Sequence, residues 1–174
     1  MTWLVEGYGS IRDFFEAGGY VLWGVFGAAV LMWSFIVERL LYFRLEMPGR
    51  MDEVRAAWAK RTDHTSWHAR RIREQLLSEF AIDVNRNVNM VGTCTAVAPL
   101  FGLLGTVTGM ISVFDVMANL GTGNARAMAS GVSMATLPTM AGMVVALSGV
   151  YFTASLPKRA KEAIEELGDE LRYY

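Results

Sequence analysis

Two long stretches without any Asp, Glu, Lys, Arg or His follow each other in the second half of the chain, at residues 87–114 and 127–157. As helices rising 1.5 Å per residue they would measure roughly 42 and 46 Å, whereas the hydrocarbon core of a bilayer is about 30 Å thick. Each is therefore long enough to cross a membrane. Because only residues 115–126 separate them, the pattern predicts two transmembrane helices joined by a short loop.

A third uncharged stretch, residues 18–37, is closed by Glu38 and Arg39. The residues before it contain Glu6, Asp13 and Glu16 but only one basic side chain, Arg12. A cleaved signal peptide begins with a basic segment, which is missing here. We therefore predict that residues 18–37 form a retained first transmembrane helix.

Basic residues are distributed very unevenly around these three spans. Of the 16 Lys and Arg residues, ten lie in residues 38–86 and four in residues 158–174, while Arg12 and Arg126 are alone on the other two flanks. Loops rich in Lys and Arg stay in the cytoplasm. This predicts a cytoplasmic segment at 38–86, a cytoplasmic tail at 158–174, and residues 1–17 and 115–126 on the outer side. The formal net charge of -1 identifies no partner.

The segments outside the spans also have helical periodicity. Apolar side chains share one face in each of three segments: Leu4, Tyr8, Ile11 and Phe15; Ile72, Leu76, Leu77 and Phe80; Ala160, Ile164, Leu167 and Leu171. Residues 1–17 are expected to form a helix in the outer interface or an extension of the first span. We expect a break at Met47-Pro48-Gly49, and Pro157 to start a new helix or kink the third span. The fold class predicted is an all-α polytopic membrane protein whose three transmembrane helices extend into a cytoplasmic helical bundle.

Small side chains recur at heptad spacing in the second and third spans. They fall at Thr95, Ala98, Gly102, Gly105, Gly109 and Ser112, and at Ala135, Thr139, Gly142, Ala146, Gly149 and Thr153. Such seams allow two helix backbones to approach closely, which is a main source of helix association in lipid. We predict a homo-oligomer with these two spans inside; an ordinary three-helix bundle is the alternative.

Hydroxyl groups inside these two spans are the candidate pore-lining groups: Thr106, Thr139, Ser133 and Thr136. A hydroxyl within a membrane helix must bond its own backbone, another helix or water, and the first is the commonest outcome. Pro138 cannot donate to the carbonyl of Met134, so a kink with a free acceptor is expected near Thr139. Lipid-facing helices rarely need so many polar groups, which favours a wet passage or a buried contact.

No motif for enzymatic or cofactor chemistry is present in the sequence. His64 and His68 have helical i, i+4 spacing but no third metal ligand at a convincing distance, so we interpret them as surface residues and predict no metal. The glycines at 102, 105 and 109 lack the following Lys-Ser/Thr of a phosphate loop. Cys94 has no partner in the chain and is interpreted as a packing residue. We expect neither an enzyme, a cofactor nor a nucleic-acid partner.

The chain resembles the MotA/TolQ/ExbB proton-channel family, and its ExbB branch most. Residues 98–114, APLFGLLGTVTGMISVF, are similar to the glycine-rich second span of that family, and residues 131–139, GVSMATLPT, to the start of its third span. The resemblance covers the three spans, the outer N-terminus and the cytoplasmic segment after the first span. It implies a pentamer in the inner membrane, with the N-terminus in the periplasm and the C-terminus in the cytoplasm.

The resemblance also implies a function and partners. Second and third helices of such a pentamer line a central pore, which holds single-span ExbD helices bearing a proton-accepting aspartate. The complex uses the proton-motive force to drive TonB, which opens outer-membrane transporters for iron-siderophores and vitamin B12. Two pore threonines of ExbB match Thr106 and Thr139. The family often has a glutamate where this chain has Met134, a departure that fits a short branch working beside a larger ExbB-like protein.

Two further functions stay open at the level of sequence. A passive scaffold that assembles and stabilises ExbD-like and TonB-like partners would need the small-residue seams but not the hydroxyls. The TolQ subunit of a Tol-Pal system would share the fold and the pore. No Asp, Glu, Lys or His lies in the second or third span, so a conducting subunit would take its titrating group from a partner.

The orientation can be tested with one cysteine. A Lys60→Cys variant in a Cys94→Ser background should resist membrane-impermeant thiol reagents in intact cells and react after the cells are opened, because basic residues hold residues 38–86 in the cytoplasm. Ready labelling in intact cells would reverse the predicted topology of all three spans.

Overall fold

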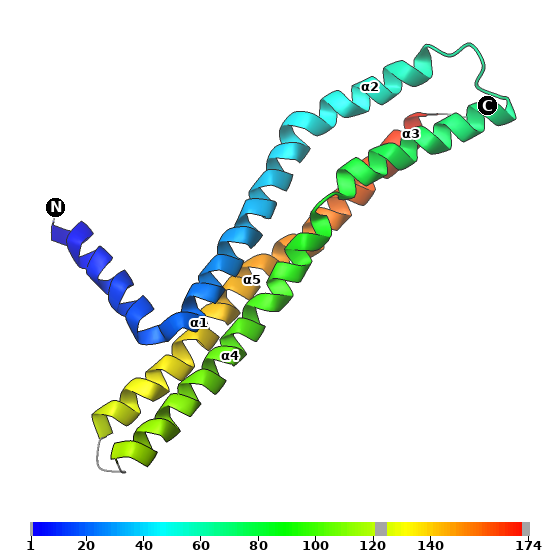
Figure 1. Cartoon of the computed structure of the whole chain (residues 1–174). Coiled ribbons are helices and arrows are strands. Elements are labelled where there is room, and N and C mark those ends of the chain that lie inside the picture. The colour runs from blue at the N-terminus through cyan, green and yellow to red at the C-terminus, as the bar shows by residue number, and fades with distance from the viewer. Residues whose placement is uncertain (1, 121–124, 172–174) are drawn as a thin grey trace. The chain divides into compact units, whose positions relative to one another are not determined.

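The computed structural model describes residues 2–120 and 125–171. Its elements are α1 (Thr2–Leu41), a π-helix η1 (Tyr42–Glu46), α2 (Met47–Ala59), α3 (Trp67–Asn85), α4 (Val88–Leu120) and α5 (Ala125–Glu170) (Figure 1). The described residues contain no strand. Three helical runs, Gly9–Ala59, Trp67–Asn119 and Ala125–Glu170, are long and apolar enough to cross a membrane. The prediction of an all-α chain with three membrane-spanning helices is therefore confirmed.

The chain forms two compact units. Unit 1 contains residues 1–32 and 93–150, and unit 2 contains residues 33–92 and 151–174. Unit 1 thus holds most of the three predicted spans, and unit 2 holds the charged segment that follows the first span together with the tail. Parts of several predictions lie outside the described residues: the side chains of Leu4 and Tyr8, residues 121–124 of the predicted loop, and residues 172–174 of the tail.

In unit 1, α1 bends sharply at Gly19. This glycine has φ 67° and ψ −169°, a backbone conformation that is open almost only to glycine. The bend gives residues 2–18 a direction of their own, visible as the dark blue helix in Figure 1, instead of a straight extension of the first span. Aromatic rings pack across the bend: Phe15 lies 4.5 Å from Trp23 and 5.6 Å from Phe26 between ring centroids.

In unit 2, the expected break at Met47-Pro48-Gly49 does not occur. The backbone passes from α1 through the π-helix η1 into α2 and remains helical to Ala59. Pro48 stands in the first turn of α2, directly after η1, and has no N–H to donate to the carbonyls of that preceding turn. The prediction of a break was wrong because the proline coincides with a change of helix type instead of a helix end.

The turn between α2 and α3 is organised by Asp63. Its carboxylate accepts hydrogen bonds from the backbone N–H groups of Thr65 and Ser66, each at 3.1 Å. The Ser66 side chain in turn accepts from the Ala69 N–H at 3.2 Å and caps α3. Hydrogen bonds from the Ser66 side chain and from the Thr65 and Ser66 backbone lower the pKa of Asp63 to about 2.

The end of α5 is held in unit 2 by arginines. Arg55 forms a two-pronged pair with Glu170, at 2.5 and 2.8 Å. Arg73 donates to the carbonyls of Gly168 and Leu171, both at 2.6 Å, and so satisfies acceptors that a helix end leaves unpaired. One face of the tail is buried, at Ala160, Ala163, Leu167 and Leu171. α5 remains one helix through Pro157, so no new helix begins there.

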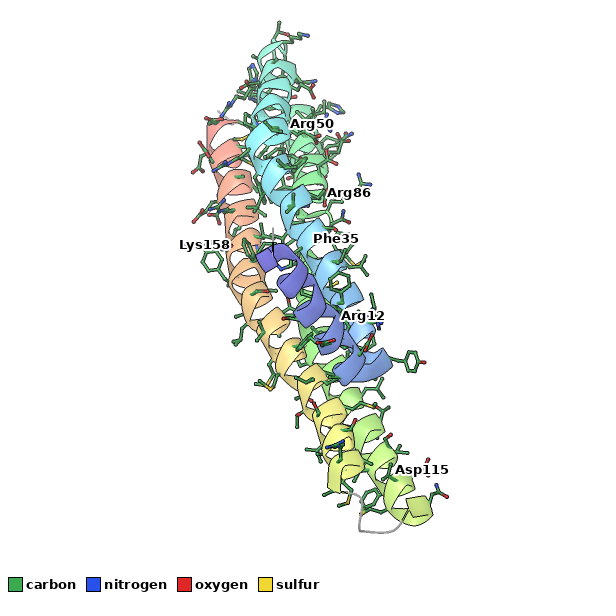
Figure 2. All side chains as sticks on the ribbon, turned by 90° about the vertical axis from the view of Figure 1, so that its left-hand side faces the viewer. Arg12, Phe35, Arg50, Arg86, Asp115 and Lys158 are labelled. Atoms are coloured by element: carbon green, nitrogen blue, oxygen red, sulfur yellow. The ribbon has the colours of Figure 1, made fainter. Side chains whose placement is uncertain are left out.

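Charged side chains gather in unit 2, as the labelled Arg50, Arg86 and Lys158 illustrate (Figure 2). His64 and His68 each pack against a tryptophan, with ring centroids 4.9 Å from Trp58 and 5.2 Å from Trp67. Among the described residues, no group of three His, Cys, Asp or Glu side chains is placed to hold a metal ion.

The bend at Gly19 can be tested by substitution. Gly19→Ala should lower the free energy of unfolding by about 1–3 kcal/mol, because an alanine is strained at this φ and ψ. Its Cβ would also lie 3.2 Å from Cγ of Met134. Thermal unfolding of the purified protein in detergent measures the change.

Gly27→Ala is the matched control on the same helix. A Cβ at Gly27 meets nothing within 4 Å, so this change should leave stability equal or raise it by about 0.5–1 kcal/mol. Equal stability of the two variants would contradict the strained bend.

Candidate functional site

The close contact between α4 and α5 is the structural centre of unit 1. A Cβ built on Gly109 would lie 2.5 Å from backbone atoms of Ala135, and one on Gly102 would lie 2.8 Å from Cα of Thr139. On the other helix, a Cβ on Gly142 would lie 2.6 Å from the carbonyl oxygen of Ala98. At these points backbone meets backbone, which only a missing side chain permits.

Two further glycines belong to the same seam. Gly105 faces the ring of buried Pro138, at 2.6 Å from a built Cβ. Gly149 faces Thr95 and also Met32, so the first predicted span joins the contact. Ala146 is half-buried. The residues expected to pack helices, namely Ala98, Gly102, Gly105, Gly109, Gly142, Ala146 and Gly149, thus lie on or beside one interhelical surface.

The two threonines singled out as pore residues have different environments. Thr139 donates its hydroxyl to the Gly102 carbonyl at 2.9 Å and so links α5 to α4. Thr106 is half-buried and donates to the Leu103 carbonyl of its own helix at 2.7 Å. The structure does not join the two hydroxyls by a hydrogen bond. Each keeps oxygen lone pairs that can accept from water or from a partner's donor.

The other two candidates, Thr136 and Ser133, lie two and five residues before Pro138 on α5. Thr136 is exposed and donates to the carbonyls of Val132 and Ser133 in its own helix, at 3.1 and 3.3 Å. Ser133 is half-buried. α5 passes Pro138 without interruption, and the Thr139 hydroxyl bonds Gly102 and, at 3.4 Å, Ala135, so the expected acceptor at Met134 is not its partner.

The tertiary contact of the Met134 side chain could not be predicted from the sequence pattern. Its side chain lies beside the bend of α1, 3.2 Å from a Cβ built on Gly19. Periodicity could not reveal this contact, because the bend depends on the φ of a single glycine. A hydrogen bond of 3.5 Å between the Thr95 hydroxyl and the Met32 sulfur is a second contact that only the tertiary structure reveals.

The polar chemistry that residues 88–114 and 127–157 offer is mainly that of hydroxyls and backbone carbonyls. Residues 88–114 and 127–157 contain no Asp, Glu, Lys, Arg or His, so these helices cannot themselves exchange a proton near neutral pH. They can solvate a charge or a protonated group carried by something else. Large apolar side chains such as Leu103, Val107, Val144 and Leu147 remain exposed on the outer faces of α4 and α5.

Comparison with known proteins gives a family match and several similar relatives. The sequence model of the MotA/TolQ/ExbB proton channel family matches residues 37–168. Biopolymer transport protein ExbB-like 1 of Synechocystis is 38% identical over 100 residues, covering 53% of this chain and 39% of its own length. Biopolymer transport protein ExbB1 of Vibrio cholerae is 31% identical over 98 residues, covering 56% and 43%.

Biopolymer transport protein ExbB of Aquifex aeolicus is 26% identical over 82 residues. That match covers 47% of this chain and 55% of the relative. The matches thus span about 40–55% of the lengths of these three relatives.

The tightness of the α4–α5 contact gives a direct test. Gly142→Ala should destabilise the purified protein by about 1–3 kcal/mol, since its Cβ would press on the rigid Ala98 carbonyl. Gly105→Leu should have a larger effect and weaken any oligomer. Size-exclusion chromatography and thermal unfolding in detergent measure both.

Gly92→Ala on α4 is the control, because its Cβ would meet only a methyl group of Thr153 at an ordinary 3.9 Å. If Gly142→Ala behaved like this control, the backbone-to-backbone contact would not determine stability.

Proposed function

This chain belongs to the MotA/TolQ/ExbB proton channel family, and we propose from that premise that it is the ExbB-type subunit of a TonB–ExbB–ExbD complex. In this role it resides in the inner membrane with its N-terminus in the periplasm and its C-terminus in the cytoplasm. It couples the proton-motive force to TonB-dependent uptake of iron-siderophores and vitamin B12 across the outer membrane. The supporting facts are the family match and the three membrane-length helices.

The observation that carries the proposal is a hairpin of packed helices whose membrane spans carry hydroxyls but no carboxylate, amine, guanidinium or imidazole group. Thr106, Thr139, Ser133 and Thr136 supply hydroxyls, and no Asp, Glu, Lys, Arg or His shares residues 88–114 and 127–157 with them. In the proposed complex these residues line the pore of a homo-pentamer. An aspartate on the ExbD-like helix inside that pore carries the proton. One charge crossing 100 mV releases about 2.3 kcal/mol, so a few protons can drive a mechanical step in TonB.

The hydrogen bonds of the two threonines suggest how they would act. The hydroxyl protons of Thr106 and Thr139 are donated to backbone carbonyls, which leaves their oxygens as acceptors. An acceptor at this position can bind a hydronium, a water or the protonated form of a partner's aspartate. We infer that Thr106 and Thr139 stabilise the transferred proton as acceptors.

Met134 is consistent with a proton carried by the partner's aspartate and not by a carboxylate of this chain. Where the family often has a glutamate, this chain has a methionine that packs beside the bend at Gly19. A role for this subunit as a carboxylate proton carrier is therefore not proposed, and a larger ExbB-like protein beside it is a candidate partner.

The second candidate function is a scaffold that assembles ExbD-like and TonB-like proteins without conducting. It is favoured by the same hydrogen bonds, because Thr106 and Thr139 already have partners within the chain and the glycine seam alone suffices for assembly. The TolQ role in a Tol-Pal system uses the same hairpin and differs only in its partners.

Thr→Val variants separate conduction from scaffolding. Thr106→Val keeps the volume and removes one acceptor; hydrogen bonds to charged groups contribute on the order of 1.5–3 kcal/mol, so proton transfer should slow roughly 10–150-fold. Thr139→Val should slow it similarly and also lower stability by about 0.6 kcal/mol, because it removes a bond between helices. The measurement is energy-dependent uptake through a TonB-type receptor, beside the oligomer yield.

Thr108→Val is the matched control. Thr108 lies two residues after Thr106 and also donates to carbonyls of its own helix, those of Leu104 and Gly105, both at 3.1 Å. Its replacement should leave uptake unchanged. Normal uptake in the double variant of Thr106 and Thr139, with normal oligomer yield, would refute the role of the hydroxyls and favour the scaffold.

A further inference from the structure

A cavity of about 180 Å³ lies in unit 2, where α1 passes into η1 and faces the end of α3. Side chains of both signs line it, including Glu38, Arg39, Tyr42, Glu46 and Arg86. One water occupies about 30 Å³ in the liquid, so the space suits a small polar group.

Two buried polar atoms on the wall of this cavity have no hydrogen-bond partner among the described residues: Nε of Arg39 and the hydroxyl of Tyr42. Arg39 is only 1% exposed. Its Nη1 donates to the Asp83 carbonyl at 3.2 Å, while its Nε is 3.9 Å from Glu38, beyond hydrogen-bond distance. A buried charge costs several kcal/mol unless it is well paired, so this half-satisfied guanidinium points to an acceptor from outside the chain.

A second cation and a free carboxylate stand at the exposed edge. Arg86 projects from the chain just before α4 (Figure 2), and its guanidinium makes no hydrogen bond or ion pair with another described residue. The exposed carboxylate of Glu46 is likewise without a partner in the described part of the chain. The unused groups are therefore three donors, at Arg39, Tyr42 and Arg86, and one acceptor, at Glu46.

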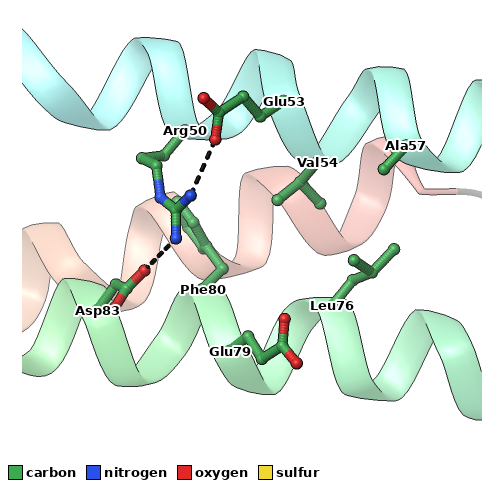
Figure 3. A pocket seen from close by; sticks show the side chains of 8 residues that line it. All are labelled: Arg50, Glu53, Val54, Ala57, Leu76, Glu79, Phe80 and Asp83. Atoms are coloured by element: carbon green, nitrogen blue, oxygen red, sulfur yellow. Dashed lines mark hydrogen bonds and ion pairs between the residues drawn. The ribbon is translucent and has the colours of Figure 1, made fainter.

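The remaining charges around the cavity are already paired. Arg50 binds Asp83 at 2.7 Å and Glu53 at 2.9 Å (Figure 3). Glu38 accepts from the Asn87 side chain at 3.2 Å. The unpaired donors of Arg39, Tyr42 and Arg86 and the Glu46 carboxylate therefore remain to bind a ligand.

The cavity stands at the level where membrane spans end. Arg39 follows the uncharged residues 18–37 by two positions, and Arg86 precedes the uncharged residues 87–114 by one. At this depth a bilayer presents its phospholipid headgroups, and basic pockets between helices at this level bind them. Guanidinium groups suit phosphate because their N–H groups match its oxygens.

We infer that this cavity binds a phosphate ester that carries an ammonium group, as in the headgroup of phosphatidylethanolamine. The phosphate oxygens accept from Arg39 Nε, the Tyr42 hydroxyl and Arg86. The ammonium group donates to Glu46. This binding does not depend on proton conduction, so its test is independent of the uptake experiment.

The test is titration of the purified protein in detergent with dioctanoyl-phosphatidylethanolamine, followed by thermal unfolding and intrinsic tryptophan fluorescence. The phosphatidylcholine and phosphatidylglycerol analogues of equal chain length should bind more weakly, because choline has no N–H to donate and glycerol has no positive charge. Tyr42→Phe and Arg86→Gln should each weaken ethanolamine-lipid binding about tenfold or more. Glu46→Gln should abolish the preference over phosphatidylglycerol.

Arg44→Gln is the matched control, since Arg44 is an exposed arginine in the same π-helix that does not line the cavity. Tyr42→Phe keeps the ring over which Arg39 lies at 4.7 Å, so the fold should persist, and circular dichroism verifies it. Equal binding of all three lipids, or unchanged binding in the Tyr42 and Arg86 variants, would overturn the proposal. If free phosphoethanolamine binds as tightly as the lipid, the site takes a soluble ester and the lipid is excluded as its source.

Discussion

The approach of α4 to α5 without intervening side chains is the constraint on which unit 1 depends. At Gly109 and Gly142 a single methyl group would meet backbone atoms of the other helix, at 2.5 and 2.6 Å. Helices in lipid gain little from burying apolar surface, so such contacts and the hydrogen bonds they allow must supply the association. The bond from Thr139 to the Gly102 carbonyl exists because the glycine lets the two backbones meet.

This packing also limits what unit 1 can do. Thr106 and Thr139 donate to carbonyls, so the lone pairs of their oxygens are what they can offer to a proton or a water. No Asp, Glu, Lys, Arg or His lies in residues 88–114 and 127–157, and Met134 packs beside the bend at Gly19. The proposed function therefore needs both a carboxylate from a partner and the hydroxyl acceptors of this chain.

Unit 2 is organised by arginines instead of glycines. Arg50, Arg55 and Arg73 bind carboxylates or helix-end carbonyls and join segments that are far apart in the sequence. Arg39 differs from them, since it is almost fully buried and only half satisfied. The contrast is the reason to assign it a ligand, because a guanidinium that is almost fully buried and has an unused donor is costly.

The sequence by itself determined the number of spans, the helical class and the family, because uncharged length, heptad spacing and the motif at residues 98–114 are local properties. It also predicted that small residues at heptad spacing pack the second and third spans. The tertiary structure decided the bend at Gly19, the continuity of helix through Pro48 and Pro157, the partners of the hydroxyls and the unpaired Arg39. These features depend on one residue's φ or on contacts between distant segments. The spacing of residue types along the sequence reveals neither of these.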